Sequence, residues 1–149
     1  MTGGPRRRAW RREHDAPFTP LEKPLADCRL ALVASSVCLA RRGQSADPNV
    51  VIGDPRLRTI AGDADTRALL NAPAGGVDAG AANLDRNVAY GLERLREAVA
   101  EGRLGELNHR HLALGGPMAA TRRSIARAAP RAAQLLTADG VDVVLLVPT

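Results

Sequence analysis

The chain has very few aromatic residues, with one tryptophan, one tyrosine and one phenylalanine among 149 residues. This scarcity argues against the nucleic-acid modules that stack bases on aromatic side chains. No apolar run approaches the ~20 residues that a membrane-spanning helix requires. Two cysteines are too few for a disulfide-dense secreted scaffold. Apolar residues still make up 45% of the chain, which is enough for one hydrophobic core.

Lysine is almost absent too, because Lys23 is the only one. A phosphate-binding P-loop, which ends in Gly-Lys-Ser/Thr, is therefore excluded. The net charge of +5 comes from five arginines between Arg6 and Arg12, since residues 13–149 carry equal numbers of acidic and basic groups. We predict that residues 1–16 form a disordered basic arm and that residues 17–149 form a single domain. The arm is the only feature that favours a nucleic-acid partner, and we do not expect one.

Nothing in the sequence indicates export. The paired arginines near the start are followed by Glu13, Asp15 and Pro17, where an export signal needs an apolar segment of ~7–15 residues. We therefore predict a cytoplasmic protein with no membrane partner, in which both cysteines are reduced thiols.

Hydrophobic patterning predicts an α/β domain. Residues 29–34 and 141–147 are short apolar runs without strict alternation, which is typical of strands buried on both faces of a parallel sheet. The second run is rich in β-branched residues and follows a glycine turn, so we predict a central strand there. Residues 90–101 and 121–138 place apolar side chains at helical spacing, and Pro130 predicts a kink in the second helix.

The intervening segments are less clearly patterned. Residues 50–52 are predicted to be a short strand, and residues 61–83 a long surface loop with one helical turn near residues 66–70. The fold prediction is a parallel-sheet, Rossmann-like layered domain that is incomplete at its carboxyl terminus, because its most apolar strand is followed by only Pro148 and Thr149.

Several short motifs along residues 17–149 are shared with a known family. They are Leu84-Asp-Arg-Asn-Val88, Leu92-Glu-Arg-Leu-Arg96, Glu101-Gly-Arg-Leu-Gly105, Arg110-His111 and Ala138-Asp-Gly-Val-Asp-Val-Val-Leu-Leu-Val-Pro148, preceded in order by Pro20-Leu21, Leu30 to Ala34, and Gly53-Asp54-Pro55 with Arg58 and Ile60. With these motifs the chain resembles the glycine/sarcosine/betaine reductase selenoprotein B family, which includes D-proline reductase subunits.

The resemblance implies a redox nucleophile just beyond this chain. In that family, the strand that matches residues 141–147 leads through a proline-containing pair into a redox-active selenocysteine or cysteine. The catalytic nucleophile is therefore expected after Thr149, where a UGA codon for selenocysteine can be read as a stop. The implied reaction is reductive carbon–nitrogen bond cleavage of glycine, betaine, sarcosine, D-proline or a similar amine. The implied partners are a pyruvoyl-bearing substrate subunit and a thiol electron donor. This truncated chain alone is expected to hold no cofactor and to be inactive.

Two residues of the chain are candidate catalytic groups. His111 matches a family histidine and is a candidate proton donor or substrate contact, the alternative being a surface or capping histidine. Cys38 follows the first predicted strand, where catalytic loops gather, and is a candidate reactive thiol, the alternative being an inert buried cysteine. Cys28 precedes that strand, at the wrong end for a site. His109 and His111 could share a strand face, but no set of four zinc ligands is found, so we predict no metal.

Three departures from the family pattern concern site loops. The family's Gly-x-His is here Ser36-Val37-Cys38, residues 72–78 lack a family histidine and aromatic residue, and residues 111–116 have lost their aromatics. These losses favour an alternative function, a catalytically inactive α/β module for binding or assembly. A nucleophile-bearing continuation of the chain distinguishes the reductase from that module.

Overall fold

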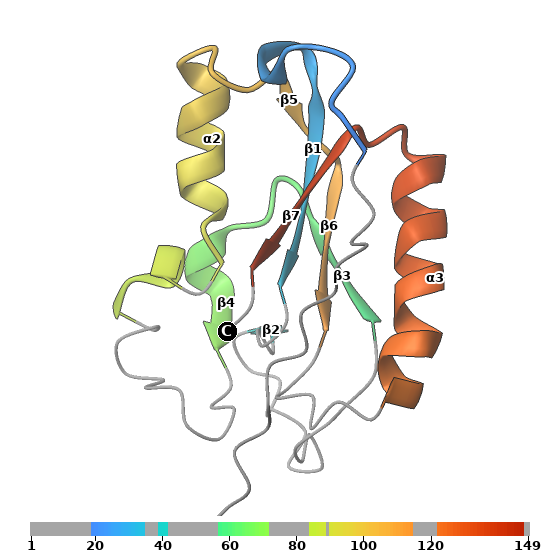
Figure 1. The fold of residues 1–149 in the computed structure, drawn as a ribbon. Coiled ribbons are helices and arrows are strands. Elements are labelled where there is room, and N and C mark those ends of the chain that lie inside the picture. Colours follow the sequence, from blue (N-terminus) through green and yellow to red (C-terminus); the bar gives the residue numbers. More distant parts are fainter. Residues whose placement is uncertain are drawn as a thin grey trace, which may run out of the picture.

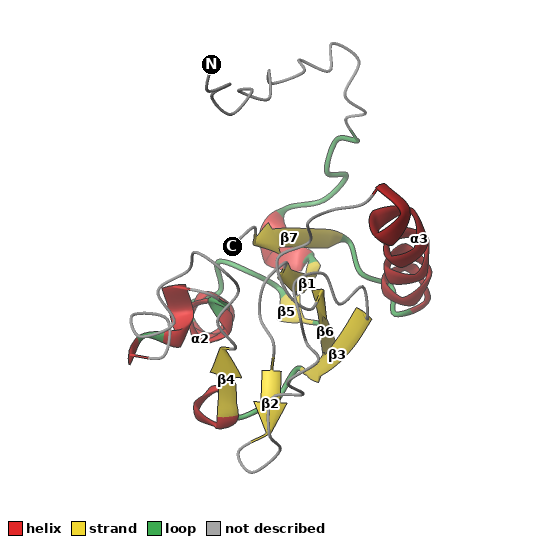
Figure 2. Ribbon diagram, turned by 90° about the horizontal axis from the view of Figure 1, so that it is seen from below, coloured by secondary structure: helices red, strands yellow, loops and turns green. Residues whose placement is uncertain are grey.

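The structure, a computed structural model, consists of a sheet with one helix on each face (Figures 1 and 2). It describes residues 19–34, 39–41, 57–71, 84–88, 90–114 and 122–147. The strands of the main sheet are β1 (Arg29–Ala34), β3 (Leu57–Ala61), β5 (Glu106–Leu107), β6 (Arg110–Leu114) and β7 (Val143–Val147), and the helices are α2 (Leu92–Ala100) and α3 (Arg122–Ala138). Short 3-10 turns are η1 (Leu25–Asp27), η2 (Thr66–Ala68) and η3 (Arg86–Val88), and β2 (Leu39–Arg41) pairs antiparallel with β4 (Leu69–Asn71).

Strand β1 lies in the interior of the sheet and is paired along both edges. On one edge it runs parallel to β7, from Leu30 opposite Val143 to Ala34 opposite Val147. On the other edge it runs parallel first to β5 and then to β6. Strand β3 pairs antiparallel with β6 and closes that side. The α/β fold class is confirmed, but the sheet is mixed, because β3 runs against its neighbour.

Each face of β1 contributes to a separate hydrophobic cluster. Leu32 and Ala34 point toward α2 and pack with Ile60, Tyr90, Leu92 and Ala113. Ala31 points to the opposite face and packs with Leu112 and with Leu136 of α3. The two helices lie on opposite sides of the sheet in Figure 2. This double cover explains why β1 is apolar without alternation, as its sequence predicts.

The predicted central position of residues 141–147 is wrong. Strand β7 pairs only with β1 among the described strands, so it is an edge strand. Val144, Leu145 and Leu146 are 40%, 41% and 68% exposed. An apolar β-branched run is compatible with either position. Only Val147, at the end of the strand, packs against the cluster on the α2 side.

Both predicted helices are present. Gly102 and Gly140, which follow α2 and α3, have φ values of +69°, the left-handed conformation that ends many helices. Pro130 lies inside α3. Among the helices that the structure describes, none has the length and apolarity to cross a membrane. The helical turn predicted near residues 66–70 is η2, but β3 and β4 were not predicted. The predicted arm at residues 1–16 and strand at 50–52 lie outside the described residues.

The carboxylate of Asp139 joins the end of α3 to the start of β6. It accepts hydrogen bonds from Arg110, with Nε at 2.6 Å, and from Nδ2 of Asn108 at 2.8 Å. The bond from Arg110, with that from Asn108, lowers the pKa of Asp139 to about 2. The guanidinium of Arg29 also donates a hydrogen bond to the backbone carbonyl of Asp139. Asp139 therefore connects the end of α3 to the first residue of β1 as well as to β6.

We expect Asp139→Asn to lower the melting temperature at pH 7 by roughly 5 °C, because it removes a charge-assisted pair between two elements. Glu101→Gln, which removes a surface pair with Arg103, is the matched control and should change it little. Since the pKa of Asp139 is lowered in the folded state, its contribution is full above pH ~4 and is lost toward pH ~2. In thermal melts followed by circular dichroism, the melting temperatures of the wild type and of Asp139→Asn should therefore converge at acid pH. A difference between them that stays constant with pH would contradict this account.

Candidate functional site

The carboxyl ends of three strands lie level with one another. Ala34, the last residue of β1, is paired with Val147 of β7 on one edge and with Ala113 of β6 on the other. The three arrows end near one another in Figure 1. In α/β sheets this edge is where catalytic loops gather. Cys38 and Thr149, predicted to lie at or before the reactive centre, follow β1 and β7 in the chain but are outside the described residues.

The sequence between β5 and β6 forms a bulge opposite β1. Between the pairs Leu30–Leu107 and Val33–Leu112, β1 advances by three residues and its neighbour by five. The regular ladder is therefore broken beside Leu32. The backbone N–H of Leu32 donates instead to Nδ1 of His111, at 3.1 Å. An imidazole thus replaces a backbone carbonyl in the interior of the sheet.

This hydrogen bond defines the state of the His111 ring. A nitrogen that accepts a backbone N–H carries no proton, so the neutral ring has its proton on Nε2. The side chain is fully buried, and Nε2 has no hydrogen-bond partner among the described residues. Burial, with a smaller effect of the positive charge on Arg96, lowers the pKa of His111 to about 4. His111 is therefore a neutral imidazole near pH 7.

Tyr90 and Arg96 belong to the same side of the sheet as His111. The hydroxyl of Tyr90 is buried without a described partner, and burial raises its pKa well above the ordinary value. The charge of Arg96 acts on both Tyr90 and His111. Arg96 itself is held by Glu93 and by the carbonyls of Gly62 and Ala64, at 2.7, 2.7 and 2.9 Å. Tyr90 and His111 are the buried members of this polar group, whereas the side chains of Arg96 and Glu93 are 30% and 41% exposed.

His109 and Cys28, the other described residues that the sequence analysis considers, do not join His111. His109 lies just before β6, its side chain is 67% exposed, and its Nε2 is 3.9 Å from Asp139. The described ranges contain no group of three His, Cys, Asp or Glu residues that could hold a metal. Cys28 is buried, and its thiol donates to the carbonyl of Pro24 at 3.3 Å, as expected of a structural cysteine. His111 is not a surface histidine, and its catalytic role stays a prediction.

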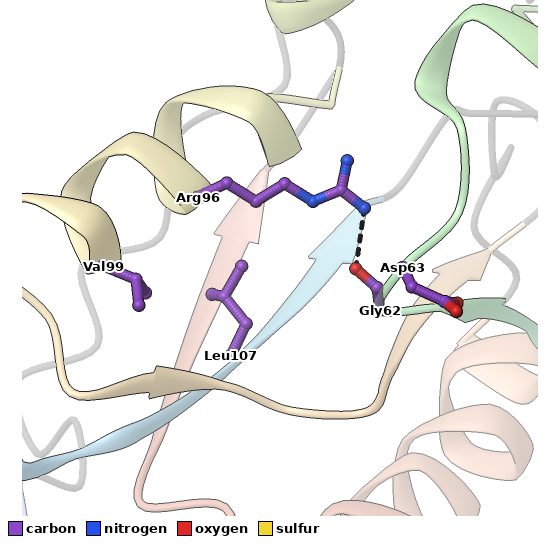
Figure 3. A pocket seen from close by; sticks show the side chains of 5 residues that line it. All are labelled: Gly62, Asp63, Arg96, Val99 and Leu107. Atoms are coloured by element: carbon purple, nitrogen blue, oxygen red, sulfur yellow. Dashed lines mark hydrogen bonds between the residues drawn. The ribbon is translucent and has the colours of Figure 1, made fainter.

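A pocket that the sequence did not predict lies at the other end of the sheet. It has a volume of about 450 Å³ and is lined by Gly62, Asp63, Arg96, Val99 and Leu107. Figure 3 shows Arg96 reaching from α2 to the carbonyl of Gly62, with Val99 and Leu107 forming the apolar side. Gly62 follows Ala61, which pairs with the first residue of β6, so the pocket is at the amino end of the parallel strands. No strand is predicted before Gly62-Asp63 in the sequence, so this pocket has no distinct sequence signal.

The neutral state of His111 predicts an acid transition. Unfolded His111 titrates near pH 6.5 and the folded residue near 4, so the unfolded state binds more protons between these values. Stability should therefore fall as the pH drops from ~6.5 to ~4, by up to about 3 kcal/mol. In His111→Asn the amide oxygen can still accept the Leu32 N–H but does not titrate, so we expect a flatter profile from urea unfolding at each pH.

Two further variants control this experiment. His109→Asn removes an exposed histidine and should leave the slope of the wild type unchanged. His111→Ala leaves the Leu32 N–H without its partner and should lose about 1–3 kcal/mol at pH 7 as well. Equal slopes for the wild type and His111→Asn would show that another group causes the acid transition.

No family model matches this chain, and neither does any curated protein sequence or solved structure. The resemblance to the selenoprotein B family therefore rests on the short motifs of the sequence, and the α/β fold rests on the chain's own structure.

Proposed function

We propose that residues 17–149 are the amino-terminal part of a cytoplasmic reductase subunit similar to the selenoprotein B family. The reaction is reductive carbon–nitrogen cleavage of a small amine or amino acid such as glycine, betaine, sarcosine or D-proline. The observation that carries this proposal is the common level at which β1, β6 and β7 end. Cys38 and the nucleophile expected after Thr149 follow neighbouring strands whose ends are in register.

This arrangement fits the chemistry of a selenolate or thiolate. Such a nucleophile attacks through its anion, and the end of a parallel strand presents it beside loops from adjacent strands. His111 lies on β6, two residues before Ala113, and is proposed as a substrate contact, because its neutral ring can donate a hydrogen bond from Nε2–H. The alternative role as a proton donor requires the protonated ring. A pyruvoyl-bearing subunit and a thiol electron donor complete the proposed system. The helices on opposite faces of the sheet support a Rossmann-like layered domain. Strand β3 differs from that arrangement because it runs antiparallel to β6.

A catalytically inactive module for binding or assembly is the second candidate. Two observations favour it. The imidazole of His111 is fully buried, and the apolar residues of β7 are exposed as in a surface that another chain covers. The two candidate functions differ in whether a redox nucleophile follows β7 in the chain.

The test extends the chain through its downstream reading frame, with selenocysteine or cysteine as the next redox residue. We expect residues 1–149 with the partner subunits to consume none of the four substrates, and the extended chain to consume at least one. Alanine at the redox position should reduce turnover by roughly 10³-fold or more. Cys38→Ser tests the second thiol, with Cys28→Ala as its matched control.

Two results would contradict the reductase. One is a stop codon other than UGA after Thr149, or no matching frame beyond it. The other is a correctly folded extended chain that consumes no substrate in the presence of its partner subunits, which would favour the inactive module.

A further inference from the structure

Two buried polar atoms on the α2 side of the sheet have no hydrogen-bond partner among the described residues. They are Nε2 of His111 and the hydroxyl oxygen of Tyr90, in residues that are 0% and 3% exposed. Nearly all buried side-chain polar atoms of folded proteins are hydrogen-bonded, either to the protein or to ordered water. An unpaired hydroxyl and an unpaired imidazole N–H each reduce the stability of the folded state. Two such groups on one side of the sheet therefore require an explanation.

His111 and Tyr90 face the same hydrophobic layer. His111 lies directly opposite Ile60 in the ladder between β3 and β6, and opposite residues of an antiparallel pair point to one face of the sheet. Ile60 belongs to the cluster that also contains Tyr90. Ala113, two residues after His111 and therefore on its face, belongs to the same cluster. The imidazole and the phenol both lie in the layer between the sheet and α2.

Arg96 is close enough to affect both side chains, but it bonds to neither of them. Its positive charge acts on Tyr90 and on His111 alike. The hydrogen bonds that its guanidinium makes within the described chain go to Glu93 and to the carbonyls of Gly62 and Ala64. The two buried atoms are therefore satisfied by something other than this side chain.

The chemistry of the two groups defines what can bind between them. Nδ1 of His111 accepts the Leu32 N–H, so Nε2 carries the ring proton and donates. The hydroxyl of Tyr90 can both donate and accept. The ligand must also be uncharged, because the charge of Arg96 is already paired with Glu93 at 2.7 Å and a buried ion would lack an opposite charge. Water meets all three requirements.

We propose that a water molecule is bound in this layer between Nε2 of His111 and the hydroxyl of Tyr90. His111 donates Nε2–H to the water oxygen, and the water donates to the hydroxyl oxygen of Tyr90. Internal waters make about two to four hydrogen bonds to groups that are otherwise unsatisfied, and these two residues provide the smaller number. The water holds the ring at Nε2 as the Leu32 N–H holds it at Nδ1. This inference does not depend on the proposed reductase activity, but a substrate atom that contacts Nε2 would have to replace this water.

Tyr90→Phe provides the first test, because the sign of its effect is informative. A buried hydroxyl without a partner is destabilising, so its removal would raise the melting temperature or leave it unchanged. A hydroxyl that holds a water stabilises the fold, and we expect Tyr90→Phe to lower the melting temperature at pH 7 by roughly 3 °C or more. Circular dichroism of the 149-residue chain measures this temperature and verifies that each variant is folded. A raised or unchanged melting temperature would overturn the proposal.

A double-mutant cycle tests whether both residues hold the same water. In His111→Asn the amide oxygen reaches the position of Nδ1, but no atom reaches that of Nε2. The losses of melting temperature in Tyr90→Phe and His111→Asn should therefore add to less than their sum in the double variant, because either change alone releases the water. Tyr90→Phe combined with His109→Asn, at an exposed histidine, should be additive. Additive losses in both pairs would overturn the shared site.

Water oxygen-17 relaxation dispersion of the same proteins detects the molecule itself. We expect the amplitude to fall by the equivalent of one internal water in Tyr90→Phe and in His111→Asn, and to stay at the wild-type value in His109→Asn. If Tyr90→Phe does not fold, His111→Asn carries this test. An unchanged amplitude would show that no water links the two residues, and a melting temperature that rises with chloride and falls in Tyr90→Phe would show that an anion is bound instead. Either result would overturn the proposal.

Discussion

The structure depends on one strand, β1, being paired along both edges and covered on both faces. Leu32 and Ala31 are completely buried on opposite sides of the sheet. Every other strand of the main sheet is positioned by β1 directly, except β3, which is attached through β6. The two helices pack on the two clusters that β1 divides. A polar residue at Ala31 or Leu32 would face an apolar cluster and lose its hydration, so this segment accepts only apolar residues.

The bulge between β5 and β6 determines how the candidate site is built. Two extra residues displace the ladder, yet β6 is again in register with β1 at Leu112 and Ala113. The imidazole of His111 compensates for the broken ladder, because its Nδ1 accepts a hydrogen bond from the Leu32 N–H, which the displaced backbone cannot reach. The cost is a buried Nε2–H without a described partner. The bulge therefore accounts both for the neutral state of His111 and for the alignment of the carboxyl ends of β1 and β6.

The local features of the fold could be predicted from the sequence, and the long-range ones could not. The strand at Arg29–Ala34 and both helices follow from hydrophobic spacing, and Gly102 and Gly140 mark where the helices end. Strands β3, β5 and β6 are short and contain arginine, glutamate or histidine, so only pairing with distant residues makes them strands. The position of β7 was missed for a similar reason, because its composition is the same in the middle of a sheet and at an edge. The pocket beside Arg96 brings residues from α2, β5 and the turn after β3 together, so it depends on contacts between segments that are distant in the sequence.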